Sequence, residues 1–236
     1  MHSEVNKVLR NIIELIISSI KGSEYKIDKE VSLGYLLSLS MQRFVMLIRG
    51  GVIFKTFNLV FIGSNVTIKE KSKIRFQKGL TIQKDCYIDA LSRLGLRLGK
   101  NVSFARGCAI ECTGSLNHIG RGLSVGNNVG FSTNCFLGCA GGIEIGDDTI
   151  IGNYVTLHSE NHNYDDLKVA IRLQGVTRKG IKVGKNCWIG AKATILDGVT
   201  IEDGCIIAAG ALVQKGTYEA NCIYGGIPAK KIGSRF

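Results

Sequence analysis

Apolar residues recur at six-residue spacing along two long stretches of the chain, and the residues that follow them are commonly small or turn-forming. The first stretch contains Val125, Phe131 and Leu137, then Ile145, Ile151 and Leu157, and the second contains Val183, Ile189, Ile195, Ile201, Ile207 and Val213. A period of six belongs neither to a helix nor to a long two-faced strand. It indicates a parallel β-helix of six-residue rungs, in which three rungs make one triangular coil.

The same repeat marks the boundaries of the predicted domain. Rungs begin at Ile62, Ile68 and Ile74 and return cleanly at Leu98, Phe104 and Ile110. The 30 glycines and single proline among 236 residues suit a fold with a tight corner after nearly every rung. The rhythm stops between His158 and Lys182. We therefore expect a β-helix over residues 56–236, with a loop excursion at 158–182 and a closing segment at 214–236.

The first 55 residues have a different pattern. Residues 3–21 carry an apolar helical face made of Val5, Val8, Leu9, Ile12, Ile13, Leu15, Ile16 and Ile20. A second apolar stretch covers residues 33–54, but its uncharged run, Val31 to Met41, is far shorter than the roughly 20 residues that span a bilayer. Terminal coils of a solenoid need a cover, so one interpretation is a helical cap over residues 1–55. A peripheral membrane helix is the alternative, and the scarcity of strongly basic flanks favours the cap.

The net charge and the cysteine content limit which binding partners and which cellular compartment we expect. A formal charge of +11 favours an anionic partner. Nucleic acid is not expected, because the Lys and Arg residues are scattered and the aromatic residues are too dispersed for a stacking strip. The N-terminal segment is interrupted by charges and does not resemble a secretory signal, so we expect a cytoplasmic protein with reduced thiols.

Two cysteine pairs have the spacing of metal ligands. They are Cys108/Cys112 and Cys135/Cys139, and four thiolates at such spacing could bind zinc. Consecutive rungs would also place small apolar residues at these positions, and a buried thiol behaves as a small hydrophobe. We therefore interpret the cysteines as structural and expect no bound metal.

Three histidines are candidates for chemistry. His162 follows the rung residue Leu157 by five positions, at the start of the excursion, where an imidazole is free to act as a general base near neutral pH. A competing arrangement combines His118, His158 and His162 into a three-histidine zinc site with an open position for water. That alternative would make the protein a β-helical hydratase.

Several segments carry a resemblance to a known family. They are Asn186–Ala191, Ile195–Ile201, Ala209-Gly210, Val213, Lys215 and Gly226–Lys230. Together they resemble the hexapeptide-repeat sugar O-acetyltransferases, which include the maltose, galactoside and colanic acid acetyltransferases. Residues 158–164 and 175–181 resemble the polysaccharide-modifying branch in particular. The resemblance covers about residues 60–236 and implies a left-handed β-helix, a homotrimer, and acetyl-CoA bound in a groove between adjacent subunits.

The resemblance also assigns roles to individual residues. The family's catalytic histidine matches His162, and its acceptor-site asparagine matches Asn134. The family's coenzyme-binding positions match Ala191, Ala209, Gln214, Lys215 and Lys230, and Trp188 matches a tryptophan beside the coenzyme arm. Gln214 replaces a commonly seen threonine, and Gly180 stands where many relatives carry proline. An asparagine at a corner is also common in β-helices, so Asn134 has a structural interpretation beside the functional one.

These roles predict a direct acetyl transfer. His162 would take the proton of a sugar hydroxyl, a backbone N–H near Ala191 would stabilise the oxyanion, and no covalent enzyme intermediate is needed. We expect a trimeric, acetyl-CoA-dependent O-acetyltransferase acting on a sugar of a bacterial surface polysaccharide or its precursor. Three alternatives remain: an N-acetyltransferase acting on a nucleotide-linked amino sugar, the zinc hydratase, and a non-catalytic β-helical module.

Overall fold

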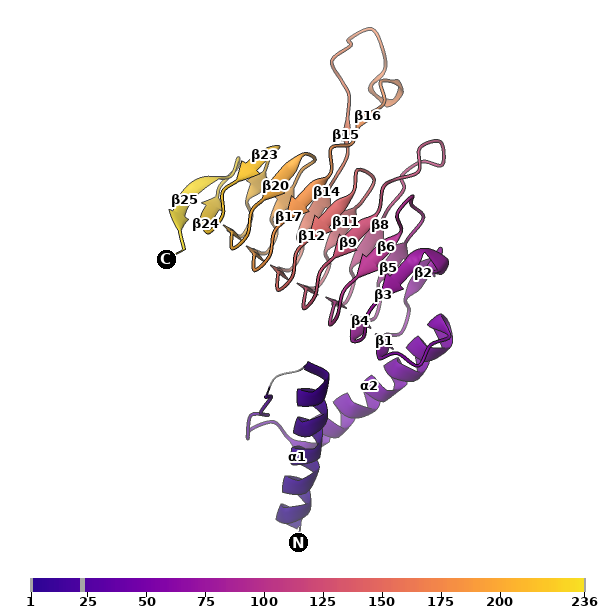
Figure 1. Ribbon diagram of the computed structural model, residues 1–236, viewed down its shortest axis with the longest axis vertical. Coiled ribbons are helices and arrows are strands. Elements are labelled where there is room, and N and C mark those ends of the chain that lie inside the picture. The colour runs from indigo at the N-terminus through magenta and orange to yellow at the C-terminus, as the bar shows by residue number, and fades with distance from the viewer. Residues whose placement is uncertain (1, 22–23, 236) are drawn as a thin grey trace.

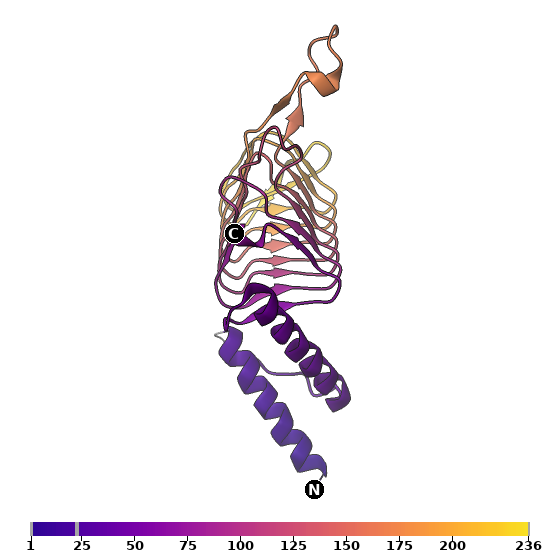
Figure 2. The ribbon, with the colours of Figure 1, turned by 90° about the vertical axis from the view of Figure 1, so that its right-hand side faces the viewer.

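The computed structural model describes residues 2–21 and 24–235. Helices α1 (His2–Lys21) and α2 (Leu33–Phe54) lie at one end of a stack of β coils that continues to the C-terminus (Figure 1). Seen with the coils behind one another, the stack has a roughly triangular outline, and a long excursion rises from one corner (Figure 2).

Three sheets form the three faces of the prism, and almost all of their strands are parallel. Face A contains β1 (Val60–Ile62), β4 (Leu80–Ile82), β7 (Ser103–Phe104), β10 (Gly130–Phe131), β13 (Ile150–Ile151), β18 (Trp188–Ile189), β21 (Ile206–Ile207), β24 (Cys222–Gly225) and β25 (Lys230–Ser234). Face B contains β2 (Thr67–Lys69), β5 (Tyr87–Asp89), β8 (Ala109–Glu111), β11 (Phe136–Gly138), β14 (Thr156–His158), β19 (Thr194–Ile195) and β22 (Leu212–Val213). Face C contains β3 (Ile74–Phe76), β6 (Leu96–Leu98), β9 (Leu123–Val125), β12 (Ile143–Ile145), β17 (Ile181–Val183), β20 (Val199–Ile201) and β23 (Gly216–Tyr218).

The apolar positions of the repeat point into the prism and stack in columns. On face B the column is Leu137, Leu157, Ile195 and Val213, each the register partner of the next. All twelve residues of the two long stretches are buried, with exposed fractions of 4% or less. On face A the rings of Phe104 and Phe131 stack with centroids 4.6 Å apart. The prediction of a β-helix of six-residue rungs is confirmed by this register.

Corners between the faces recur at equivalent places in successive coils. We call the corners between faces A and B the AB edge, and those between faces B and C the BC edge. Along the AB edge Asn134, Tyr154 and Lys192 all have left-handed backbone angles, with φ of 59°, 59° and 61°. At the next coil the same position is Gly210, with φ of 70°. The chain therefore turns in the same way at each coil, and the edges are straight rows of equivalent residues.

All eight cysteines are free and buried, as predicted. Cys108 and Cys135 belong to one column, and Cys187 and Cys205 belong to another. A hydrogen bond with Cys135 and burial raise the pKa of Cys108 to about 12, so this thiol is protonated at neutral pH. Thiolates bind metal ions, whereas protonated thiols do not. Cys108 is therefore suited to pack as an apolar side chain and not to bind a metal ion.

The excursion occupies residues 159–180, since β14 continues to His158 and β17 begins at Ile181. It carries the antiparallel pair β15 (Asn161–His162) and β16 (Val176–Thr177) and the short 3-10 helix η2 (Ile171–Leu173). A second 3-10 turn, η1 (Lys71–Lys73), lies in the first coil. At the far end of the stack, β25 folds back antiparallel on β24 and closes the chain.

Helix α2 covers the first coil with its C-terminal half. Met46 and Gly50 are buried there, and a Cβ on Gly50 would lie 2.2 Å from the carbonyl oxygen of Val60. Two arginines of α2 reach the β-helix, with Arg49 Nη1 donating to the Ile62 carbonyl at 3.0 Å and Arg43 lying over the Phe61 ring. This half of α2 is thus fixed by both sterics and hydrogen bonds.

Helix α1 extends away from the coils (Figure 1). Its polar side is tied to the segment before α2: Arg10 donates to the carbonyls of Asp28 and Val31, and Glu14 accepts from the Ile27 N–H. The side chains of Val5 and Ile20, both part of the predicted apolar face, lie outside the described residues. The remaining apolar side of α1 does not contact the coils closely enough to bury it, and Ile12 and Leu15 are exposed.

Candidate active site

The excursion presents His162 to solvent. It lies on β15, opposite Val176 of β16, and its side chain is exposed. Beyond it the hairpin is held by its own polar contacts, since Asn163 donates from its N–H to the Gly175 carbonyl at 3.1 Å and from Nδ2 to the Gln174 carbonyl at 3.0 Å. The imidazole therefore stands on a two-stranded stem at the BC edge, where it is accessible from solvent.

Two buried polar side chains fix the two limbs of this stem. On the outgoing limb Ser159, fully buried, donates from Oγ to the Gly138 carbonyl at 2.7 Å and accepts from the Gly141 N–H at 2.9 Å. On the returning limb Asp197, only 2% exposed, accepts from the N–H groups of Lys179 and Gly180 at 2.7–3.0 Å. A buried carboxylate with several such bonds is strongly held in place. Asp197 had no assigned role in the sequence, because only the coil register places it beneath the excursion.

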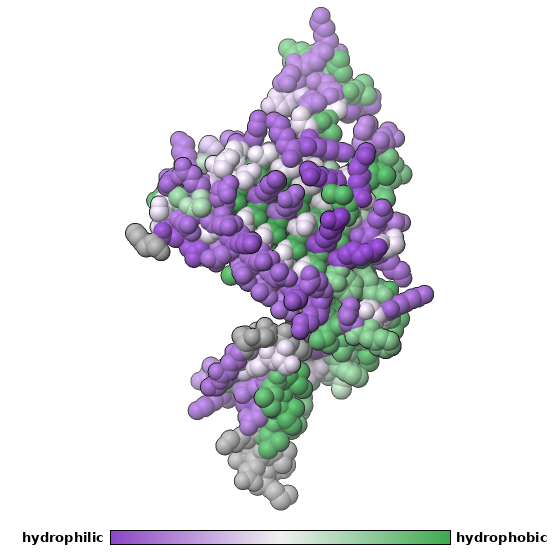
Figure 3. All heavy atoms as spheres, viewed as in Figure 1, coloured by the Kyte–Doolittle hydropathy of each residue, from purple (hydrophilic) through white to green (hydrophobic). Residues whose placement is uncertain are grey.

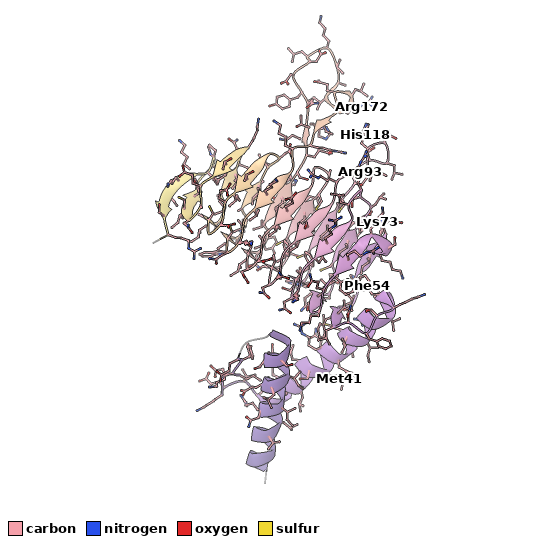
Figure 4. All side chains as sticks on the ribbon, in the orientation of Figure 1. Met41, Phe54, Lys73, Arg93, His118 and Arg172 are labelled. Atoms are coloured by element: carbon pink, nitrogen blue, oxygen red, sulfur yellow. The ribbon has the colours of Figure 1, made fainter. Side chains whose placement is uncertain are left out.

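A third contact ties the stem to a neighbouring loop. Arg178 donates from Nε to the Glu160 carboxylate at 2.6 Å and from Nη1 to the carbonyl of His118 at 2.9 Å. His118 lies in the loop next to the excursion, on the same side of the stack as Arg172 (Figure 4). Glu160 is thus committed to Arg178 and Asp166 accepts from the Lys168 N–H, so neither of these carboxylates is the partner of His162 in this structure.

His158 has a different environment from His162. Its ring lies 5.4 Å from the Phe136 ring of the preceding coil, and its side chain is about half-buried. Burial lowers the pKa of His158 from its ordinary value of 6.5. This histidine packs against the coil, and its position on β14 keeps it in the β-helix rather than in the excursion.

The three histidines do not form a metal centre. Within residues 2–21 and 24–235, no group of three or more His, Cys, Asp or Glu side chains is arranged to hold a metal ion. His118 contributes a backbone carbonyl to Arg178, while His158 packs on Phe136. The geometry thus argues against the zinc hydratase alternative.

Three of the predicted coenzyme residues lie on face A or at the AB edge. Trp188 points outward from β18 with 54% of its surface exposed, beside the exposed Ile150 of the previous coil. Ala191 follows Trp188 at the corner of the same coil, Ala209 is the equivalent residue of the next coil, and the Gly210 N–H donates to the Ala191 carbonyl at 2.8 Å. This row of small residues leaves the edge open beside an aromatic ring.

Asn134 also lies at the AB edge, and the structure gives its side chain a structural role. A Cβ on Gly107 would lie 2.2 Å from Asn134 Oδ1, so the glycine of the preceding coil makes room for this amide. The same pairing recurs between Gly79 and Asn101 and between Gly204 and Asn221. Asn134 is therefore one instance of a repeated corner motif, and its assignment to acceptor binding stays a prediction.

Gln214 and Lys215 follow β22 at the BC edge. Lys230 is exposed at the start of β25 on face A, where it pairs with Gly225 beside the AB edge. Lys179, which we did not predict, lies next to Lys215: a Cβ on Gly198 would be 3.0 Å from Lys215 and 3.2 Å from Lys179. The adjacent Lys215 lowers the pKa of Lys179. Two ammonium groups this close make a site for an anion such as a phosphate.

The candidate residues thus form two groups on one chain. One group follows the AB edge and the other the BC edge, and a full rung of face B separates the two edges, on the order of 15–20 Å at roughly 3.3 Å per residue. Two shallow hollows lie elsewhere, on face C, with Lys182 and Thr200 lining one of them. None of the predicted site residues lines either hollow. In the part of the chain that the structure describes, the candidate residues therefore lie at two separate edges, outside both of these hollows.

Comparison with known proteins agrees with this architecture. Residues 180–215 match the family model described as bacterial transferase hexapeptide (six repeats). Over 93 residues, 39% of the chain, the sequence is 33% identical to the probable acetyltransferase Rv3034c of Mycobacterium tuberculosis. The match spans 31% of the length of that curated relative, so it does not carry over the whole protein's activity.

Solved structures with a similar fold include AntD, an N-acyltransferase from Bacillus cereus. The complex with dTDP and 3-hydroxybutyryl-CoA has a TM-score of 0.52 at 18% identity, covering 75% of this chain and 80% of AntD. A variant bound to dTDP and coenzyme A has a TM-score of 0.51 at 19% identity, covering 78% of this chain and 89% of the other. The predicted fold class, a left-handed parallel β-helix with helices at its N-terminal end, is confirmed, as is the resemblance to hexapeptide-repeat acetyltransferases.

Replacing Asp197 should loosen the excursion without unfolding the coils. Asp197→Ala leaves two buried N–H groups unpaired, which costs about 1–3 kcal/mol each in comparable settings. Limited proteolysis should therefore cut within residues 163–175 at least about tenfold faster than in the wild type. Asp203→Ala is the matched control, because Asp203 caps the Lys185 N–H at 2.7 Å at another corner. Equal cleavage of both variants would show that Asp197 does not hold the stem.

The half-buried His158 predicts a defined pH dependence. Because burial lowers its pKa, the folded protein binds fewer protons here than the unfolded chain, which titrates near 6.5. The folded state therefore keeps its full stability above pH 6.5. It loses part of that stability as the pH falls from 6.5 toward the lower pKa that His158 has in the folded protein. His158→Phe keeps a ring against Phe136 but cannot titrate, so its free energy of unfolding should fall less than the wild type's between pH 7.5 and 5.5. Parallel curves from denaturant titrations would contradict this.

Proposed function

We propose that the protein is an acetyl-CoA-dependent acetyltransferase that transfers an acetyl group to a sugar hydroxyl, with His162 as the general base. The observation that carries the proposal is the exposed imidazole, held on a clamped stem at an edge of a hexapeptide-repeat prism. The similarity to a probable acetyltransferase and to an acyltransferase fold that binds coenzyme A supports the choice of reaction.

The chemistry needs few groups. His162 removes the proton from the acceptor hydroxyl as its oxygen attacks the thioester carbonyl of acetyl-CoA. The negative charge that develops on the carbonyl oxygen requires a hydrogen-bond donor, and a backbone N–H near Ala191 is our candidate. Collapse of the tetrahedral species then expels coenzyme A thiolate, which takes the proton from the His162 imidazolium, and leaves the acetyl ester on the sugar. The reaction is direct, so no nucleophilic side chain takes part.

The coenzyme would lie between chains. Trp188, Ala191, Ala209 and Lys230 would contact it from the AB edge, while Gln214 and Lys215 would serve its phosphate end from the BC edge. Lys179 joins Lys215 as a second cation for those phosphates. Since the two groups are a full rung apart on one chain, we propose a homotrimer in which the AB edge of one subunit faces the BC edge of its neighbour.

The tip of the excursion supports the shared site. Leu167 is 98% exposed and Ile171 and Leu173 are more than half exposed, although all three are apolar. Apolar side chains at the end of an extended, ordered loop favour a contact with another chain. In the proposed trimer this tip reaches across the groove and covers the acceptor, which would exclude water from the thioester.

We propose a sugar of a bacterial surface polysaccharide, or its precursor, as the acceptor, and the cytoplasm as the compartment. An amino group on a nucleotide-linked sugar is the second candidate acceptor, and AntD is an N-acyltransferase of this fold. Release of coenzyme A with a panel of neutral sugars, amino sugars and nucleotide sugars distinguishes the two. Preference for an amino sugar would make the reaction N-acetylation on the same scaffold.

Loss of the base should slow the chemical step. His162→Ala should lower kcat about 10²–10⁴-fold, which is the usual contribution of a general base, and should leave acetyl-CoA binding unchanged. His158→Ala should cost much less, since His158 packs against Phe136. Steady-state rates and coenzyme binding by calorimetry measure both effects. Full activity of His162→Ala would remove the mechanism, and equal loss in both variants together with bound zinc would favour the hydratase.

Mixed trimers test whether two chains share a site. Light scattering should report three chains for the wild type. Ala209→Trp should block the coenzyme groove at the exposed AB edge, whereas His162→Ala removes the base at the BC edge. If each site takes one edge from each of two chains, trimers assembled at random from both inactive variants should regain about a quarter of the wild-type sites. Trimers that stay inactive would locate the site within one chain.

A further inference from the structure

The exposed residues of α2 carry no charge, and those of its C-terminal half are mostly apolar. The helix contains only two charged residues, Arg43 and Arg49, and both are turned toward the β-helix. Arg43 Nη1 donates to Thr81 Oγ1 at 3.3 Å, and Arg49 bonds the Ile62 carbonyl. The β-helix thus removes the helix's own charges from the side that faces solvent.

Helix α1 carries exposed apolar residues as well. We define the apolar helical surface by Ile12 and Ile16 of α1 and by Phe44, Val45, Ile48 and Val52 of α2, which are 43–72% exposed. Apolar side chains gather over α1 and around the end of α2 in Figure 3. A patch of this kind is larger than the scattered single apolar residues of an ordinary surface and marks an interaction site. The cap interpretation does not use it, because the side of α2 that contains the buried Met46 and Gly50 covers the first coil.

Basic residues border the patch where α2 meets the coils. Residues 55–78 contain six Lys and Arg residues and a single acid, Glu70. Lys55, Lys71 and Lys73 are exposed, and Lys71 Nζ donates to the carbonyl of Ile53 near the end of α2 at 3.2 Å. Apolar side chains bordered by ammonium groups match the two layers of an anionic membrane surface, which offers acyl chains beneath phosphate headgroups.

We propose that the apolar helical surface binds an anionic phospholipid bilayer and holds the protein on the membrane. Helix α2 is long and apolar enough to cross a bilayer by length and composition. Its C-terminal half, however, is covered by the first coil, so lipid cannot surround it and the helix lies in the interface. The excursion rises from the side of the stack opposite the helices, so this contact leaves the candidate active site open (Figure 1).

A second copy of the chain fits the patch less well. Pairing two such surfaces face to face would bury the apolar residues, but it would also bring the lysines of residues 55–78 of both copies together. Like charges at that distance repel, whereas the same lysines attract anionic headgroups. The overall charge of +11 likewise favours binding to anionic headgroups over pairing of two copies.

Vesicle binding of the full chain tests the proposal. The probes are sedimented vesicles of pure phosphatidylcholine and of equimolar phosphatidylcholine and phosphatidylglycerol. The wild type should bind the anionic vesicles at least about tenfold more tightly than the neutral ones, and added salt should weaken that binding. The double variant Phe44→Glu/Ile48→Glu should bind the anionic vesicles at least about tenfold more weakly than the wild type.

The control and a second variant keep the result interpretable. Leu94→Glu/Leu116→Glu carries the same change in charge at exposed loop positions and should bind like the wild type. Ile12→Glu/Ile16→Glu lies on α1, away from the coils, and should lose binding even if the α2 variant fails to fold. Absence of wild-type binding, or undiminished binding by both helix variants, overturns the proposal. A change in oligomeric state of the helix variants without vesicles overturns it in favour of a contact between copies.

Discussion

The parallel register between successive coils is the constraint on which the rest of the structure depends. Each inward side chain rests on the equivalent side chain of the coil before, as Leu157 rests on Leu137 and supports Ile195. Register of this kind requires every coil to turn at the same three places, because a corner displaced by one residue would turn an aliphatic column outward. The edges follow from this requirement, and the edges are where the exposed functional side chains lie.

The register tolerates a long insertion provided that the chain returns to the same place. Val183 pairs with Ile145 even though the excursion separates them, and Ile195 pairs with Leu157. The entropic cost of closing a loop grows only slowly with its length, so the insertion itself is inexpensive. At the insertion, some backbone N–H groups need acceptors from side chains. The buried oxygens of Ser159 and Asp197 accept hydrogen bonds from such groups where the chain leaves and rejoins the coil.

The contrast between the repeated core columns and the long-range contacts at the excursion explains what the sequence could and could not predict. The six-residue period is a local signal, so it identified the core columns and the break that contains His162. The contacts of Asp197 with Lys179 and Gly180, and the nearness of Lys179 to Lys215, join residues 17 to 36 positions apart. Such contacts depend on the exact length of the coils and of the excursion, and no local pattern encodes them. For the same reason the pairing of Asn134 with Gly107 was not visible, nor was the turning of Arg43 and Arg49 away from the outer side of α2.

A stack of this kind leaves the proposed general base, His162, exposed, and that exposure has a chemical consequence. A thioester next to a general base is open to attack by water, so an acetyltransferase must exclude water before the base acts. In the described part of a single chain, His162 is exposed on one edge, and on another edge Ala209 is exposed and Ala191 is partly exposed. Closure by the apolar tip of a neighbouring excursion would supply the missing wall only in the assembled protein. In the proposed trimer an isolated chain could still fold, because its core lies within its own coils, yet it would lack a protected site; assembly would then control catalysis without any change in the β-helix itself.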